Sequence, residues 1–383
     1  MFSHRLPFHL PRNPIADAIA QRRAAGLEIL DLTESNPTRA GIEYPAGEIL
    51  AGFDAPESLV YDPSSNGLSQ ARAQVAELYH VTADRVVLTA SSSEAYSWLF
   101  KLLCDPGDEI LTPRPSYPLF EYLAGLESVE VRQYPLRYDT GWFIDFEPLA
   151  SSIHERTRAI VVVSPNNPTG SYIKDWELER LRHLCRVHKL ALISDEVFFD
   201  YRLDSGTGKS LTSVSDVLTF CLGGLSKMVG LPQMKLGWMI AGGPDALREE
   251  ALSRIDLIAD NYLSVGTPVQ YALANLLSAR AGVQRQITAR LRSNLEFLIP
   301  AVRQSSVFRL LEAEGGWYAI LRAPLVRSEE EWTLKLLERG VMVQPGYFYD
   351  FESEAFLVVS LLTPEERFRE GVGRMMTDDF ECR

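Results

Sequence analysis

Two lysines, Lys227 and Lys235, stand in the glycine-punctuated apolar stretch GGLSKMVGLPQMKLGW. A surface lysine usually has polar neighbours, so this setting suggests that at least one of the two takes part in chemistry. A lysine held in apolar surroundings loses its proton more readily and becomes a nucleophile that can form a Schiff base with an aldehyde. The stretch follows the apolar run LTFCLGG, which predicts a buried strand directly before the lysines.

Three other stretches place polar groups where apolar runs end. In TASSSEAYSWLFKLL, Ser92 and Ser93 open a predicted helix, whose free amides and dipole favour an anion. In SPNNPTG, the proline after Asn167 favours an extended conformation that aims its amide out of a strand end. In LALISDEVFFDY, a carboxylate at a buried strand end needs a cation or donor, so Asp195 is a functional candidate and Glu196 a structural one. Alone, the first stretch also fits an ordinary helix cap and the second an ordinary turn.

Taken together, these groups match the needs of pyridoxal 5′-phosphate. The helix start would cradle the phosphate, the aspartate would pair with the pyridinium nitrogen, and the lysine would bind the aldehyde as an imine. No single motif identifies this cofactor. The occurrence of all four motifs in one chain, and their order along it, support it.

The apolar runs predict the strands that position these groups. From about residue 84 to 243, the runs VVLTA, EILTP, AIVVVSP, LALISDE, LTFCLGGLS and LGWMIAGG alternate with amphipathic stretches such as WELERLRHLCRVH. This alternation predicts an α/β fold with a mostly parallel sheet, whose ligands gather at the strand ends. After residue 266, one long helical stretch precedes VFRLL, GGWYAILR, EEEWTLKLLERG, VMVQP and FLVVSLL, which predicts a smaller α+β domain.

Composition limits the class of partner. The chain has 383 residues, more than the roughly 250 to 300 at which single cores stop growing. A net charge of −13 without a basic run argues against nucleic acid or an anionic membrane, which leaves small molecules. The cysteines are scattered without metal or disulfide spacing, which predicts a reducing compartment and no metal site; they are Cys104, Cys185, Cys221 and Cys382. Prolines interrupt MFSHRLPFHLPRNP and no apolar run nears the roughly 20 residues of a membrane span, so we expect a cytoplasmic protein.

The motifs resemble those of the fold-type I pyridoxal-phosphate enzymes, and specifically the class I and II aminotransferases. The run SKMVGLPQMKLG is similar to the family's S-K-x-x-G-L-x-G-x-R-x-G, and the likeness extends from DLTESNP to LVVSLLT. The resemblance implies a three-layer fold with a mostly parallel, seven-stranded sheet in the large domain. We expect an N-terminal segment, 1–44, on the small domain, a large cofactor-binding domain, 45–279, and a small α+β domain, 280–383.

The resemblance also implies roles for individual residues. Lys227 matches the lysine that forms the Schiff base with the cofactor, and Asp195 matches the partner of the pyridinium nitrogen. Asn167 matches the asparagine that hydrogen-bonds the phenolic oxygen of the ring. Ser92 and Ser93 match the residues whose amides hold the phosphate.

Two tyrosines complete the implied cofactor site. Tyr117, in PRPSYPLF, matches the aromatic residue that stacks on the cofactor ring. Tyr61, in VYDPSSNGLSQAR, resembles the tyrosine that reaches the phosphate of the neighbouring subunit's cofactor, which implies a homodimer with shared active sites. Ordinary core packing is the alternative interpretation for both.

Three positions around the cofactor depart from the family pattern. Lys235 stands where the family has an arginine. An ammonium group, which acts as a compact point charge, therefore replaces a guanidinium group that can form two parallel hydrogen bonds. Gly224 replaces a serine or threonine that contacts the phosphate, and Ser226 is the candidate to compensate. Phe198 replaces a tyrosine that donates to the phenolic oxygen.

The largest departure concerns the substrate. Val358, in FLVVSLLT, stands where the family has an arginine that grips the substrate α-carboxylate. Either another arginine supplies that grip, with Arg39 in ESNPTRAG favoured over Arg202 in DYRL, or the substrate presents no α-carboxylate there. Ser35 also stands where the family has a glycine beside the substrate. A solvated loop arginine is the alternative interpretation of Arg39.

The sequence therefore predicts a pyridoxal-phosphate-dependent aminotransferase. Lys227 would bind the cofactor covalently and shuttle a proton while an amino group moves between an amino acid or amine and a keto acid. A lyase or decarboxylase of the same fold is the alternative, because Val358 leaves open where a carboxylate lies. A non-catalytic cofactor sensor is disfavoured, because Lys227 is present.

Overall fold

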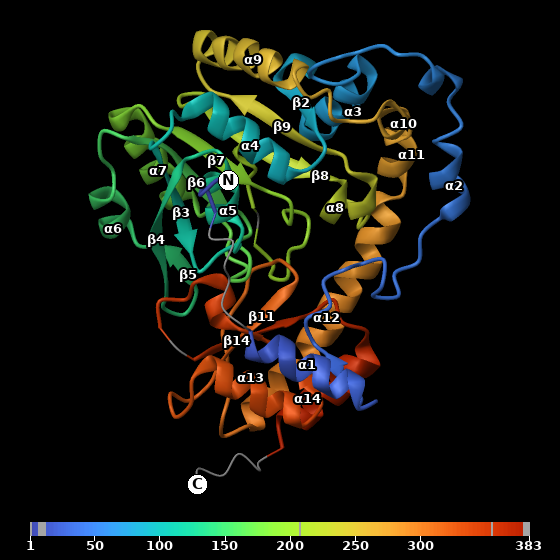
Figure 1. Ribbon diagram of the computed structural model, residues 1–383, viewed down its shortest axis with the longest axis vertical. Helices are drawn as coiled ribbons and strands as arrows, with labels where there is room; N and C mark the ends of the chain where they lie inside the picture. Colours follow the sequence, from blue (N-terminus) through green and yellow to red (C-terminus); the bar gives the residue numbers. More distant parts are fainter. Residues whose placement is uncertain (1, 7–12, 207, 354, 378–383) are drawn as a thin grey trace.

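The computed structural model describes residues 2–6, 13–206, 208–353 and 355–377, so Cys382 lies outside the described residues. An eight-stranded sheet in the order β2-β9-β8-β7-β6-β3-β4-β5 forms the upper part of the molecule in Figure 1. The strands are β2 (Val86–Thr89), β3 (Glu109–Arg114), β4 (Glu130–Tyr138), β5 (Trp142–Ile144), β6 (Thr157–Val163), β7 (Ala191–Asp195), β8 (Thr219–Gly224) and β9 (Gly237–Gly242). The central strands β4, β3, β6, β7 and β8 run parallel, whereas β9 is antiparallel to both β8 and β2.

The α/β fold with a mostly parallel sheet is confirmed, with one strand more than the seven expected. The six apolar runs named above form β2, β3, β6, β7, β8 and β9. The strand β4 lacks such a run, because only the middle of EVRQYPLRY is buried. The extra strand β5 pairs antiparallel with the end of β4 as a hairpin, which extends the sheet by one edge strand.

Helices cover both faces of this sheet, which gives three layers. One face packs on α4 (Ser92–Leu103), α5 (Phe120–Leu126) and α9 (Asp245–Asp260), and the other on α3 (Ser69–Tyr79) and α7 (Asp175–His188). Side chains along β7 point alternately to the two faces of the sheet, so Leu192 belongs to one buried cluster and Ile193 to the other. Shorter helices are α2 (Ala46–Ala51), α6 (Phe146–Ser151), α8 (Leu225–Met228) and the 3₁₀ segments η1 (Pro56–Leu59), η2 (Ala83–Arg85), η3 (Leu211–Ser213) and η4 (Pro232–Met234).

The lower part contains a four-stranded antiparallel sheet in the order β10-β11-β14-β13. Its elements are β10 (Arg309–Leu310), β11 (Tyr318–Arg322), β13 (Gln344–Pro345), β14 (Phe356–Ser360), α13 (Glu329–Glu338), α14 (Glu365–Met375) and η5 (Gly346–Tyr349). The N-terminal part of the chain joins it through β1 (Leu30–Asp31), which pairs with β12 (Val341–Met342), and α1 (Pro14–Ala24), which lies beside α13 in Figure 1.

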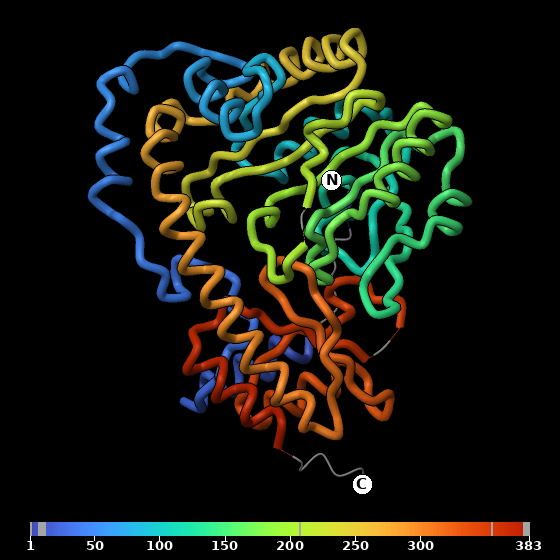
Figure 2. Tube along the Cα trace, turned by 180° about the vertical axis from the view of Figure 1, so that it is seen from behind, coloured from blue at the N-terminus to red at the C-terminus, as the bar shows by residue number. Residues whose placement is uncertain are grey.

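The helix α12 (Arg280–Gln304) connects the two parts, as Figure 2 shows from behind. The long helical stretch expected after residue 266 is divided into α10 (Thr267–Tyr271), α11 (Leu273–Ser278) and α12. Near its start, the Gln284 amide donates to the backbone oxygen of Met228, 3.0 Å away. Further along, the Asn294 amide donates to the backbone oxygens of Leu361 and Thr363. Because α12 contacts both parts, the domain boundaries at 44/45 and 279/280 stay predictions.

Among the described residues, none of the helices has both the length and the apolar composition that crossing a lipid bilayer requires.

Candidate active site

The predicted chemical groups meet at one edge of the large sheet. In the parallel ladder, Val163 of β6 pairs with Asp195 of β7, and Asp195 pairs with Leu222 of β8. The carboxyl ends of these strands therefore lie side by side. Asn167 follows β6, Asp195 ends β7 and Lys227 follows β8, so parallel pairing brings together residues that are far apart in the chain.

The start of α4 offers unpaired backbone donors. The Ser91 hydroxyl accepts the Glu94 amide, 3.2 Å away, and the Glu94 carboxylate accepts the Ala90 amide, 2.6 Å away, so these residues cap the helix. The amides of Ser92 and Ser93 follow the cap and have no acceptor within the residues that the structure describes. Two free donors at the start of a 12-residue helix suit an anion such as a phosphate.

Asp195 is a buried carboxylate with one donor on each oxygen. Its side chain is 6% exposed; Oδ1 accepts the Val197 amide and Oδ2 accepts the Tyr96 hydroxyl, each at 3.1 Å. Burial raises the pKa of Asp195 to about 6, while the Val197 amide, the Tyr96 hydroxyl and the Lys227 charge lower it. The carboxylate is therefore ionised at neutral pH and suited to pairing with a protonated ring nitrogen.

Lys227 lies in the short helix α8 among aromatic rings. Its Nζ is 5.0 Å from the centre of the Trp317 ring and 5.3 Å from the centre of the Phe198 ring. Burial lowers the pKa of Lys227 to about 8, although the Asp195 charge opposes the shift. The lowered pKa increases the share of the neutral amine near neutral pH, which is the nucleophilic form.

The Asn167 side chain has unused hydrogen-bonding capacity. Its Oδ1 is buried, and no partner for it is present within residues 13–206, 208–353 and 355–377. The neighbouring Asn166 also has a buried Oδ1 without a partner in the described residues, but its Nδ2 donates to the backbone oxygen of Pro115, 3.1 Å away. An amide left open beside Asp195 and Lys227 fits a role in holding a polar ligand.

Tyr117 lies between the start of α4 and Asp195. Burial raises the pKa of Tyr117, the Asp195 charge adds to the shift, and a hydrogen bond with the Ser93 side chain opposes it. Its ring meets Phe120 edge-on with centres 5.8 Å apart. The structure thus brings Tyr117 close to the predicted site residues Ser93 and Asp195, and it also packs against a buried cluster, so its stacking role stays a prediction.

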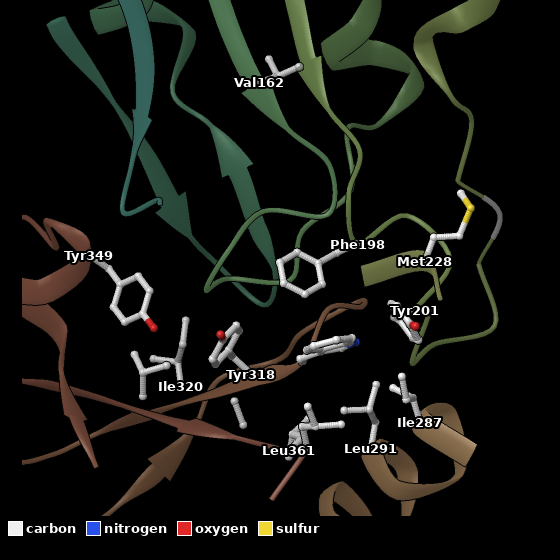
Figure 3. Close-up of a cluster of buried hydrophobic side chains, with 14 of the residues drawn as sticks. Val162, Phe198, Tyr201, Met228, Ile287, Leu291, Tyr318, Ile320, Tyr349 and Leu361 are labelled. Carbon is white, nitrogen blue, oxygen red and sulfur yellow. The ribbon is translucent and has the colours of Figure 1, made fainter. Parts of the chain in front are cut away.

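The opposite side of Lys227 is formed by the small sheet. Figure 3 shows Phe198, from the segment after β7, directed toward Tyr318 of β11. The ring centres of Phe198 and Tyr318 are 6.4 Å apart, and Phe198 meets Trp317 edge-on at 5.2 Å. Burial raises the pKa of the Tyr318 hydroxyl, whereas the Ser35 side chain, which lies near that hydroxyl, lowers it. The loop that holds Ser35 therefore borders the same space.

Val358 presents an apolar side chain at the position where the family has a substrate-binding arginine. Val358 is fully buried and lies opposite Ile320 of β11 and Gln344 of β13. Of the two candidate replacements for the missing arginine, Arg202 is partly engaged: its Nε donates to Asp204 at 2.5 Å, and its guanidinium lies 4.2 Å from the ring centre of Tyr172. Its Nη1 is buried without a partner in the described residues, so Arg202 stays a candidate, although a less available one than Arg39.

Three predicted residues have side chains without a partner in the described part of the chain. Arg39 and Lys235 are exposed and form no ion pair there, and Ser226 is half-buried. The backbone near Lys235 nevertheless approaches the start of α4, because Gly237 pairs with Thr89 at the end of β2. Tyr61 is 82% exposed, which excludes core packing for this tyrosine within the subunit.

Glu196 has the structural role that the sequence suggested. It is buried, and its Oε1 accepts the Ser194 hydroxyl at 3.0 Å and the Leu211 amide at 2.8 Å. Sequence reasoning missed Tyr96, Trp317 and Tyr318. The available signal for Tyr96 was a hydroxyl-bearing ring inside the apolar helix run AYSWLF, but only the fold identifies its partner.

The amino-acid sequence is similar to those of known proteins. Residues 54–374 match the family described as aminotransferase class I and II. The glutamate-pyruvate aminotransferase AlaA of Haemophilus influenzae is 26% identical over 367 residues, which are 91% of this chain and 90% of that protein. An alanine aminotransferase of Mycobacterium bovis is 31% identical over 71% of this chain and 66% of its own length.

The fold has close relatives among solved structures. The alanine aminotransferase of Pyrococcus furiosus superposes with a TM-score of 0.89 at 24% identity, over 98% of each chain. An aminotransferase of Escherichia coli gives a TM-score of 0.87 at 22% identity, over 98% of this chain and 97% of that one. At these identities the likeness concerns the fold.

Proposed function

The chain belongs to the class I and II aminotransferases, and from that premise we propose that it transfers amino groups with pyridoxal 5′-phosphate held where β6, β7 and β8 end. The aminotransferase activity follows from the family and from relatives named for it. One observation carries the cofactor proposal: a buried carboxylate, Asp195, and a lysine of lowered pKa, Lys227, lie at neighbouring strand ends.

The residues present fit the ring of this cofactor. Asp195 would pair with the ring nitrogen, since it is ionised at neutral pH and keeps acceptor capacity on both oxygens. The Asn167 side-chain Nδ2 would donate to the phenolic oxygen, and Tyr117 would cover the ring face. Phe198, as an apolar side chain, would leave the phenolic oxygen with one donor fewer than a tyrosine provides.

The phosphate would lie at the start of α4. The free amides of Ser92 and Ser93 supply directed donors, and the helix dipole adds to their attraction. We assign Ser226 and Lys235 to the same phosphate, with Lys235 contributing charge more than directed hydrogen bonds.

Lys227 would work as the covalent and proton-transfer residue. When bound, pyridoxal phosphate supplies the electron sink for the bond broken at the substrate α-carbon. The Lys227 amine would take the proton from the substrate α-carbon as a general base and would deliver it, as a general acid, to the cofactor carbon that carries the transferred amino group. Its pKa of about 8 lets it do both near neutral pH.

We propose an α-amino acid donor and a keto-acid acceptor, because the relatives are named for glutamate and pyruvate, alanine and tyrosine. Arg39 would supply the carboxylate contact that Val358 does not, since it is exposed without an ion pair in the described residues and follows Ser35 in the loop that borders Tyr318. A lyase or decarboxylase reaction is not favoured by these relatives.

We further propose a homodimer in the cytoplasm. The segment that contains η1 runs along one side of the molecule in Figure 1 and exposes Leu59, Val60 and Tyr61. Exposed apolar side chains in sequence mark a surface that a partner would cover. Tyr61 would then reach the phosphate of the partner's cofactor.

One experiment tests the proposal as a whole. Purified protein incubated with pyridoxal phosphate should absorb visible light, and borohydride should attach the cofactor to a peptide that contains Lys227. A panel of amino acids and plain amines is then tested for loss of the visible band. Pyridoxamine phosphate together with a keto acid is the expected product pair. Released ammonia or carbon dioxide, or a protein that takes up no cofactor, would refute the assignment. Lys209→Ala, at an exposed lysine paired with Asp175, is the control.

A further inference from the structure

Tyr96 of α4 donates a hydrogen bond to Asp195, the residue that would pair with the ring nitrogen of the cofactor. We propose that Tyr96 is a positioning residue: its hydroxyl fixes the orientation of the Asp195 carboxylate and favours the ionised form that receives the N–H of the cofactor ring. The inference rests on the proposed pyridoxal-phosphate site and adds to it a residue that does not touch the cofactor.

The position of Tyr96 is set by the same helix that would hold the phosphate. It lies one turn after Ser92 on α4, so a single rigid element carries both the anion donors and this hydroxyl. The side chain is 1% exposed, and its ring is fixed by Phe100 and Phe120, with ring centres 5.9 and 5.3 Å away. A ring held in this way keeps its hydroxyl in one place.

The hydrogen bond from Tyr96 acts on Asp195 within a small set of groups. The charged or titratable groups that interact with Asp195 are Lys227, Tyr96 and Tyr117, and the Val197 amide is the other donor. Burial together with the Asp195 charge raises the pKa of Tyr96 well above its ordinary value, so the hydroxyl keeps its proton at every working pH. Tyr96 is thus a permanent donor to Oδ2, and a carboxylate oxygen can accept a second hydrogen bond from a ring N–H.

Removing this hydroxyl has a defined electrostatic consequence. The bond stabilises the ionised carboxylate against its burial, so its loss would raise the pKa of Asp195 further above about 6. The form that pairs with the ring nitrogen would then be lost at a higher pH. A tyrosine that only filled space would leave the pH dependence of ligand binding unchanged when its hydroxyl was removed.

The test uses the apoprotein and pyridoxine 5′-phosphate, which lacks the aldehyde and cannot react with Lys227. Its dissociation constant is measured by calorimetry from pH 5 to 8 for the wild type, Tyr96→Phe and Tyr134→Phe. Tyr134 is the matched control, since it is equally buried and donates its hydroxyl to the backbone oxygen of Val161 at 2.8 Å. The ionisations of the ligand are common to all three proteins, so only differences between their profiles count.

We expect the pH at which binding is half lost to rise by about one unit in Tyr96→Phe and to stay unchanged in Tyr134→Phe. Equal profiles for Tyr96→Phe and the wild type, with the wild type binding, would overturn the Tyr96 inference alone. Failure of the wild type to bind at any pH would overturn the proposed cofactor site and this inference with it. If Tyr96→Phe does not unfold cooperatively, Tyr96→Met removes the same hydroxyl and must give the same shift.

Discussion

The two sides of Lys227 differ in how closely they follow the family pattern. The side made by the ends of β6 and β7 and the start of α4 keeps Asp195 and Asn167, and it gives each Asp195 oxygen a hydrogen-bond donor. The side made by the small sheet and the N-terminal loop carries Val358 and Ser35 in place of the expected residues. The electron-sink chemistry needs the charge of Asp195 on the first side, whereas the second side can vary with the substrate.

The elements explain why the two sides can vary independently. The first side is built into the eight-stranded sheet, where neighbouring strands fix each position by hydrogen bonds. The second side comes from β14, β11 and a loop, which are joined to the first side by α12, by side-chain packing and by a few backbone hydrogen bonds, such as that from the Gly316 amide to Tyr201. Substitutions there alter the space in front of Lys227 without moving Asp195.

The largest effect on activity is expected from replacing Lys227, which lies between the two sides. Lys227→Ala should lower the rate of amino transfer by at least about 10⁴-fold, because it removes both the covalent attachment and the general base. Stopped-flow measurement of a single half-reaction would reveal the loss. Lys209→Ala should retain full activity, and an active Lys227→Ala protein would contradict the assignment.

Asp195→Asn should affect activity and stability in opposite directions. Loss of the charge beside the ring nitrogen should lower kcat/KM by roughly 10²- to 10³-fold. The folded-state pKa of about 6 exceeds the ordinary value of 3.8, so burying the ionised carboxylate costs the apoprotein about 3 kcal/mol above pH 6 and nothing below about pH 4.

The substitution should therefore raise the thermal midpoint of the apoprotein by a few degrees at pH 8 and leave it nearly unchanged at pH 4. Calorimetric scans at the two pH values measure the difference. An equal change at both pH values would argue against the ionised state of Asp195 as the cause.

On the other side of Lys227, Arg39→Ala should raise KM for an α-amino acid about tenfold with kcat changed much less, because a charge-assisted contact to the carboxylate is lost. Arg39→Lys should lie between the two. The control is Arg202→Ala, whose guanidinium is already paired with Asp204 and should leave KM unchanged. Steady-state kinetics would contradict the role of Arg39 if both alanine variants behaved alike.

The smallest effect is expected at the boundary between the two sides. Phe198→Tyr should restore a donor to the phenolic oxygen and lower the pKa of the Lys227 Schiff base by about one unit relative to the native protein. Visible absorbance followed against pH gives both midpoints. The adjacent Phe199→Tyr is the control, since Phe199 packs on Tyr172. Equal or inverted midpoints would refute the prediction.

Local sequence patterns identified the strands best where burial was continuous. The run AIVVVSP gave β6, because all of its central residues are buried, whereas β4 has exposed residues near both ends and was missed. The polar candidates at strand ends were recognised for the same reason, since each directly follows a buried run. Tyr96 was missed because its partner, Asp195, lies 99 residues away in the chain.

By itself, the sequence determined the α/β fold, the family and the three residues at strand ends, Asn167, Asp195 and Lys227, because these follow from short-range patterns. Only the tertiary structure decided how the remaining side chains are used. It paired Arg202 with Asp204, gave Asp195 a second donor in Tyr96, and placed the Lys227 amine against the rings of Trp317 and Phe198. Hydrogen bonds and burial depend on which distant segments pack together, and that packing sets the pKa of each group.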